Sequence, residues 1–127
     1  EIFFMPGHTV GSIVVFDHET GLLFSGDNIS DSLWIMFDTS ARLSEYVEHL
    51  MDIKLLPIQG IVAAHRGIIF PISIMSDLLR TISCINPETD RTFTHPRKHS
   101  NIGKNVEPWK ISSIYMLSTI KIRLNNY

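Results

Sequence analysis

The sequence has 127 residues, of which 44% are hydrophobic and 19% are charged, with a single cysteine. This composition fits one small globular domain and excludes a disordered chain or a scaffold built on disulfides. The formal net charge of -2 gives no electrostatic attraction to nucleic acid or to an anionic membrane surface, so we expect neither as a partner.

Two further features of the sequence concern its location. No run approaches the ~18 apolar residues of a membrane-spanning helix, and we expect no signal peptide. Cys84 lies in an apolar helical pattern that predicts a buried, reduced thiol, and we expect a cytoplasmic protein. The chain begins at Glu1 and is apolar from the next residue, which favours a piece of a longer protein.

The first predicted elements form a hairpin. Residues 13–16 (IVVF) are a β-branched apolar run that predicts a strand covered on both faces. The polar stretch DHETG then leads to a second apolar run at residues 22–26. Because a hairpin returns the chain to the edge that it left, the loops before and after it lie side by side. These loops contain His8 and Asp27.

Residues 28–40 show neither a helical nor a strand period and predict an irregular loop. Three large side chains lie within it: Trp34, Met36 and Phe37. They either line a pocket or anchor the loop on the core.

The most regular pattern predicts a helix that is capped by Thr39 or Ser40. Its apolar stripe comprises Leu43, Tyr46, Val47, Leu50 and Met51. Residues 61–64 (IVAA) then predict a buried strand that ends at His65. A second helix begins near Pro71, and its inward stripe comprises Met75, Leu78, Leu79 and Ile82.

The last third of the chain is less regular. Residues 86–110 lack an apolar period and predict a long loop. Ile120, Ile122 and Leu124 alternate with polar residues, which predicts a half-buried strand near a sheet edge. The full order of elements predicts helices packed on a sheet, an α/β or α+β fold.

Three polar side chains are expected at strand ends, where layered folds place their sites: His8, Asp27 and His65. Imidazole nitrogen and carboxylate oxygen suit zinc, iron or manganese, so these three residues are candidate metal ligands. The alternative is a pair of hydrogen-bonded loop histidines and a turn-forming aspartate.

The motifs PGHTVGS, SIVVF, ETGLLFSGD and VAAHRG together resemble the C-terminal half of the metallo-β-lactamase fold, over roughly residues 1–82. The resemblance implies an α/β fold: half of an αββα sandwich, with a mostly antiparallel sheet and two flanking helices. It also implies two metal ions, zinc or else iron or manganese. His8 would bind one ion, Asp27 would bridge both, and His65 would bind the second.

One part of the family's pattern is not found. Family members carry a His-x-His-x-Asp-His motif in the first half of the domain, and this sequence has no such string. His95 and His99 do not replace it, because Pro96 prevents a helical arrangement and their neighbours are basic. We therefore interpret residues 1–127 as a partial domain. Each metal would have two protein ligands, too few for tight binding by this chain alone.

The resemblance implies a hydrolase in which metal-bound hydroxide attacks an ester, thioester, amide or phosphoester of a small-molecule substrate. Its catalytic acid or base is expected in the missing half, so the chain alone should be inactive. Two alternatives are a non-catalytic remnant that depends on a partner and an iron-dependent oxidoreductase on the same fold. Arg66 either steers an anionic substrate or is an exposed arginine without a specific role. Half a sandwich also predicts association through the exposed sheet surface.

Overall fold

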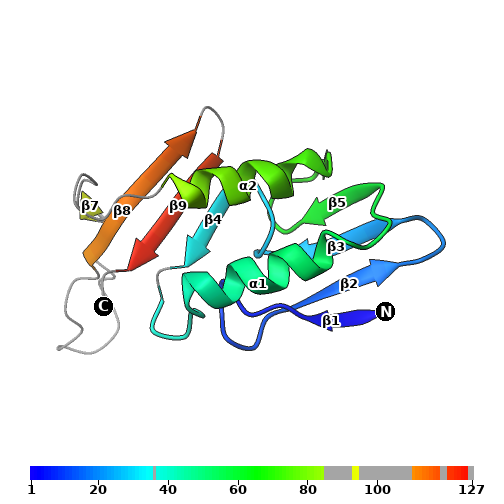
Figure 1. Cartoon of the computed structure of the whole chain (residues 1–127), viewed down its shortest axis with the longest axis horizontal. Coiled ribbons are helices and arrows are strands. Elements are labelled where there is room, and N and C mark those ends of the chain that lie inside the picture. The colour runs from blue at the N-terminus through cyan, green and yellow to red at the C-terminus, as the bar shows by residue number, and fades with distance from the viewer. Residues whose placement is uncertain (36, 85–92, 95–109, 118–119, 126–127) are drawn as a thin grey trace.

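The computed structural model describes residues 1–35, 37–84, 93–94, 110–117 and 120–125 (Figure 1). These residues form two β-sheets and two helices, which confirms the expected α/β class with two flanking helices. Most strand pairs in the larger sheet are antiparallel, as expected.

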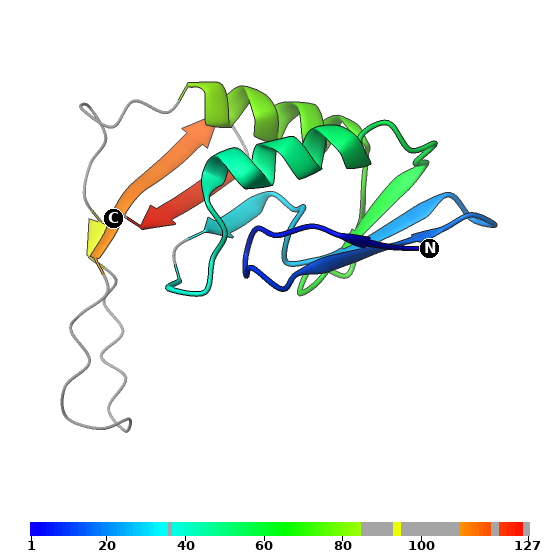
Figure 2. The same ribbon diagram turned by 60° about the horizontal axis from the view of Figure 1, so that its bottom comes forward.

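The larger sheet has the strand order β1 (Ile2–Phe4), β2 (Ile13–Asp17), β3 (Leu22–Gly26), β5 (Gly60–Ala63) and β6 (Ile69–Phe70). The second sheet has the order β4 (Ser32–Ile35), β9 (Ile120–Asn125), β8 (Lys110–Leu117) and β7 (Phe93–Thr94). The helices are α1 (Leu43–Ile53) and α2 (Ser73–Ser83). Both helices cover the same side of the larger sheet, as Figures 1 and 2 show.

Two strand pairings of the larger sheet bring distant loops together. Strands β2 and β3 form the predicted antiparallel hairpin, with Val15 opposite Phe24. Strand β3 also pairs with β5 in parallel, so both strands end at the same edge of the sheet. There the backbone N–H of Ala64 donates to the carbonyl oxygen of Gly26 at 2.8 Å. The residues that follow these two strands, Asp27 and His65, are therefore neighbours.

The core lies between the helices and the larger sheet. Helix α1 buries Tyr46, Leu50 and Ile53. Helix α2 buries Ile74, Met75, Leu78 and Thr81, while Leu79 and Ile82 are partly buried against the core. The predicted stripe of α1 is wrong at Met51, which is 57% exposed. Ile53, two positions further on, is buried instead.

The hairpin strands are covered on one face only, which corrects the prediction for residues 13–16. Val14 and Phe16 are buried, whereas Ile13 and Val15 are 50% and 37% exposed. Alternation of this kind is normal for a sheet that has helices on one side. A run of consecutive apolar residues therefore did not indicate two covered faces here.

The loop predicted at residues 28–40 contains a strand, β4, which pairs in parallel with β9. The strand predicted around residues 120–124 is confirmed as β9, which lies near the sheet edge, between the edge strand β4 and β8. Residues 93–94 form β7, so the long loop predicted at 86–110 contains a strand. The remainder of that loop, apart from Lys110, lies outside the described residues.

Two local predictions in and beside the helices are also wrong. Helix α1 begins after Arg42, and no side chain caps it. Ser40 instead donates its hydroxyl to the backbone of the loop that carries His8. Cys84 is exposed at the end of α2, where the apolar pattern no longer faces the core.

Candidate metal centre

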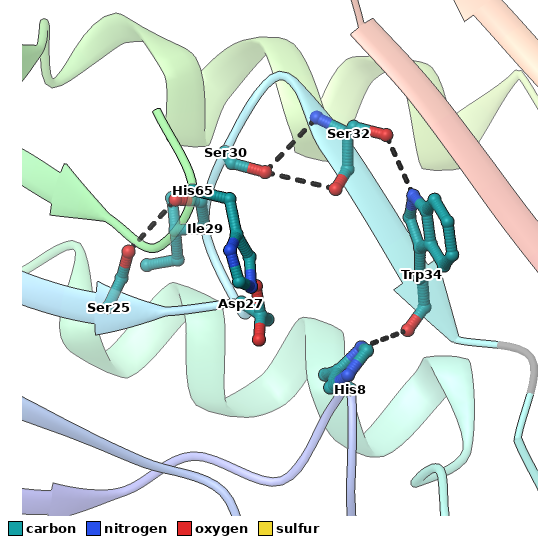
Figure 3. Close-up of polar contacts among 8 residues, drawn as sticks. All are labelled: His8, Ser25, Asp27, Ile29, Ser30, Ser32, Trp34 and His65. Carbon is teal, nitrogen blue, oxygen red and sulfur yellow. Dashed lines mark hydrogen bonds and ion pairs between the residues drawn. The ribbon is translucent and has the colours of Figure 1, made fainter. Parts of the chain in front are cut away.

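The three predicted ligands line one cavity of about 380 Å³. His8, Asp27 and His65 share its wall with Ser30, Ser32, Trp34, Phe37, Ala64 and Arg66. They come from three loops that are far apart in the sequence, as Figure 3 shows. Trp34 and Phe37 thus line the pocket, the first of the two roles considered for them, whereas Met36 lies outside the described residues.

Asp27 and His65 form the closest pair among the three. The Nε2 atom of His65 lies 3.5 Å from Oδ1 of Asp27. The two side chains are 83% and 42% exposed, so solvent screens their attraction. Their adjacency follows directly from the parallel pairing of β3 with β5. Both donor groups therefore remain accessible from the cavity.

The backbone at His65 adopts a conformation that non-glycine residues rarely take. Its φ angle is +64°, in the left-handed region, and Gly67 follows with φ of +61°. This conformation costs free energy for a residue with a Cβ atom, and such strain gathers at functional sites. In this loop it belongs to the turn that directs the chain from β5 towards β6.

His8 is held by hydrogen bonds from three directions. Its backbone N–H donates to Oδ1 of Asn28 at 2.9 Å. Its carbonyl oxygen accepts from the hydroxyl of Ser40 at 2.8 Å. Its Nδ1 atom lies 2.9 Å from the carbonyl oxygen of Trp34, a contact drawn in Figure 3. Backbone and side chain are therefore both fixed.

The contact with Trp34 also determines which imidazole nitrogen of His8 can act as a ligand. A carbonyl oxygen only accepts hydrogen bonds, so Nδ1 of His8 must carry the proton. The neutral ring then has its lone pair on Nε2. The ring of Phe37 packs edge-on against the imidazole, with centroids 5.0 Å apart. An imidazole oriented through one nitrogen is the arrangement that metal-binding histidines use.

Asn28, directly after Asp27, joins the loops around the site. It is 1% exposed, and its Nδ2 donates to the carbonyl oxygen of Met5 at 2.7 Å. Its own carbonyl oxygen accepts from the hydroxyl of Tyr46 at 2.8 Å. Tyr46 is fully buried, and burial raises the pKa of its phenol well above the ordinary value. Helix α1 therefore anchors the loop that carries Asp27.

Arg66 has a partner on the rim of the cavity. Its Nη2 atom lies 2.6 Å from Oδ1 of Asp31. This Oδ1 is buried and has no hydrogen-bond donor in favourable geometry, so the contact acts as an ion pair. Arg66 is exposed, and neither of the two roles considered for it is tested by this contact. It links the turn after β5 to the loop before β4.

The donor chemistry of the site fits a divalent metal, whereas the number of donors is small. Two imidazoles and one carboxylate are ligands for zinc, iron or manganese. Among the described residues, however, no three histidine, cysteine, aspartate or glutamate side chains are close enough to hold one ion together. His8 lines the cavity apart from the pair formed by Asp27 and His65. His8, Asp27 and His65 therefore have the chemistry of a metal site but supply only part of its ligands.

The other histidines lie elsewhere. His18 is in the turn of the hairpin and pairs with Glu1 at 2.9 Å. His49 is on α1 and contacts the ring of Phe4, with centroids 5.8 Å apart. His95 and His99 lie outside the described residues.

Comparison with known proteins identifies the fold. No protein-family model matches the sequence, and no curated protein matches it. Several solved structures do match. A metallo-β-lactamase family protein from Thermus thermophilus is 22% identical over 65% of this chain, with a TM-score of 0.55. A metallo-β-lactamase from Pontibacter korlensis is 22% identical over 67%, also with a TM-score of 0.55. An archaeal superfamily protein from Sulfolobus tokodaii is 18% identical over 82%, with a TM-score of 0.53.

The chain therefore has part of a metallo-β-lactamase fold. It covers 29%, 41% and 38% of these three structures, respectively, so it spans less than half of their length. Neither helix among the described residues is long and apolar enough to cross a membrane.

Proposed function

We propose that this chain is part of a metal-dependent hydrolase of the metallo-β-lactamase superfamily. The observation that carries the proposal is that three residues from separate loops, His8, Asp27 and His65, line one cavity on this fold. A metal bound there would polarise the scissile carbonyl or phosphoryl group and supply hydroxide near neutral pH. The substrate is a small-molecule ester, thioester, amide or phosphoester.

The chain's own residues have distinct roles in this proposal. His8 presents Nε2 because Trp34 occupies its other nitrogen. Asp27 would be shared by both ions, since its carboxylate has two oxygens. His65 would hold the second ion from the strained turn after β5. The aromatic rings of Trp34 and Phe37 form an apolar wall against which a substrate can pack.

The missing ligands must come from polypeptide outside this chain. Zinc sites in enzymes use at least three protein ligands, and this chain offers two to each ion when Asp27 is shared. The chain covers less than half of each matching structure. We therefore propose that the isolated chain binds zinc weakly and does not hydrolyse substrates. The sequence holds one cysteine, which suits a reducing compartment, and we propose the cytoplasm.

The test uses a protein in which this chain is joined to the rest of such a domain. His8→Ala and Asp27→Ala should each reduce kcat/KM by at least about 100-fold. Thermal unfolding should show that the fold is retained. Metal analysis of the purified protein should find zinc, whereas iron together with redox activity would indicate an oxidoreductase. Unchanged turnover in both variants would contradict the assignment of these residues.

A further inference from the structure

The turn that carries His65 lies at the surface of the protein. All of residues 65–69 are exposed. The left-handed backbone at His65 costs free energy, so surrounding contacts must hold it in place. Its contact with Asp27 is weak, because the two side chains are 83% and 42% exposed and their closest atoms lie 3.5 Å apart. When both side chains bind a metal, their donor atoms face the ion instead of each other. A different contact is therefore needed to fix the turn.

The ion pair between Arg66 and Asp31 supplies this contact. Arg66 directly follows His65, and its Nη2 atom lies 2.6 Å from Oδ1 of Asp31. This oxygen is shielded from water, and among the described residues no hydrogen-bond donor reaches it in favourable geometry. The guanidinium of Arg66 therefore provides its compensating charge. Without Arg66, the carboxylate oxygen would lose its cation without regaining water.

Asp31 belongs to a loop that is itself held firmly. Ile29 and Ser30 are buried. The hydroxyl of Ser25 donates to the carbonyl oxygen of Ile29 at 2.9 Å. The hydroxyl of Ser30 donates to the carbonyl oxygen of Ser32 at 3.0 Å and accepts from its backbone N–H at 3.1 Å, as Figure 3 shows. Asp31 lies between these two serines, so its backbone position is fixed.

We propose that Asp31 is a positioning residue that acts through Arg66. The ion pair fastens the exposed turn after β5 to the rigid loop before β4, so that the imidazole of His65 stays in the cavity wall. The same loop then contacts the turn twice: Asp27 is available to bind a metal, and Asp31 holds the turn. This role rests on the proposed function, because it takes His65 as a metal ligand.

The first experiment needs no metal and measures amide hydrogen exchange in the 127-residue chain. The N–H of Ala64 bonds to the end of β3 next to the turn, whereas the N–H of Gln59 bonds to the residue before β3, at the far end of the same two strands. Asp31→Asn and Arg66→Gln should each speed exchange at Ala64 by about 3- to 10-fold, because the turn opens more often. Exchange at Gln59 should change by less than about twofold, and the double variant should exceed neither single variant by more than this.

The second experiment follows the imidazole nitrogens of the same variants by NMR during a zinc titration. Both variants should raise the zinc concentration for half of the His65 response by about 3- to 10-fold, and that for His8 by less than about twofold. The two substitutions change the charge near the cavity in opposite directions. A purely electrostatic effect would therefore weaken zinc binding in Asp31→Asn and strengthen it in Arg66→Gln, whereas loss of positioning weakens it in both.

Asp77→Asn and Arg80→Gln are the matched controls. These two residues form an exposed ion pair on α2, so their replacement removes the same charges and should change neither readout by more than about twofold. Far-UV circular dichroism verifies the fold of each variant. Unchanged exchange at Ala64 in both variants, or opposite changes in their zinc affinity, would overturn the proposal. A wild type whose His65 does not respond to zinc would instead overturn the ligand assignment on which the proposal rests.

Discussion

At the scale of single residues, the site depends on how the loop of His8 is fastened. The side chain of Asn28 accepts a hydrogen bond from the backbone N–H of His8 and donates one to the carbonyl oxygen of Met5. The backbone carbonyl oxygen of Asn28 accepts a hydrogen bond from the hydroxyl of Tyr46. All of these hydrogen bonds lie in or at the edge of the core, where a polar group without a partner costs more free energy than it does in water. One buried amide therefore sets the distance between the loops of His8 and Asp27.

Replacement of Asn28 tests this fastening. Asn28→Ala leaves the N–H of His8 and the carbonyl of Met5 without partners, and should lower the free energy of unfolding by about 2 to 4 kcal/mol. Urea denaturation monitored by circular dichroism measures the change. Ser83→Ala is the control, because Ser83 is exposed at the end of α2 and bonds only within that helix. A loss below about 0.5 kcal/mol for Asn28→Ala would contradict the role given to this amide.

Tyr46 gives a prediction about pH. Burial raises the pKa of its phenol in the folded state above the ordinary value of 10.0, so folding favours the neutral form. The contribution of the neutral phenol is fully present below pH 10. Above it the unfolded state loses the proton first, and the free energy of unfolding falls by up to about 1.4 kcal/mol per pH unit.

The Tyr46→Phe variant isolates this effect. Its free energy of unfolding should be lower than that of the wild type at pH 7, by about 1 to 2 kcal/mol, because the bond to Asn28 is lost. The difference should shrink or reverse as the pH rises above 10. Urea unfolding curves at pH 7 and at pH 11 measure both values. Parallel pH profiles for the two proteins would show that the phenol does not titrate in this way.

The sequence was sufficient to locate the three candidate ligands, although not the residues that support them. His8, Asp27 and His65 occur in short motifs at strand ends, so their placement follows from local pattern and from the hairpin. Asn28 and Ser40 have no such pattern, and the residue that both support, His8, is 20 and 32 residues away from them, respectively. The one signal for these supporting residues was a polar side chain directly after a candidate ligand, namely Asn28 after Asp27.

At the scale of elements, the loop between β1 and β2 depends on a glycine. A Cβ atom at Gly7 would lie 2.7 Å from Cδ2 of Tyr46 and 2.9 Å from Oδ1 of Asn28. Both neighbours are held in the core, so neither can move without breaking the hydrogen bonds described above. The glycine allows the loop of His8 to lie close against α1.

Gly7→Ala should therefore destabilise the fold by about 1 to 3 kcal/mol, the usual cost of overpacking. Gly11→Ala, in the same loop, is the matched control, since a Cβ atom there has no neighbour within 4 Å. Its effect on the free energy of unfolding should be within about 0.5 kcal/mol. Thermal or urea unfolding compares the two. Equal losses for the two variants would show that the close approach at Gly7 does not matter.

Element type was predicted better than element environment. The hairpin, both helices and the strand before His65 follow from periodicity alone. Strand β4 was missed because its partner, β9, begins 85 residues after the end of β4, and no local pattern encodes that pairing. The predicted number of covered faces of β2 was also wrong, because the sequence of one strand does not reveal what packs on each of its faces.

At the scale of the whole molecule, the fold brings three candidate ligands to one cavity and leaves one face of the larger sheet exposed. Both features agree with a chain that covers less than half of the structures it resembles. In the proposed function, the further ligands come from polypeptide outside the chain.

The assignment of the ligands can be tested on the chain itself by nitrogen NMR of its imidazoles during a zinc titration. The signals of His8 and His65 should shift together at the lowest zinc concentrations, with weak affinity, while His18 and His49 serve as internal references. Asp27→Asn should weaken the response of both by about tenfold or more. Zinc shifts confined to His18 or His49, or a response of His8 without His65, would show that these loops do not form a metal site.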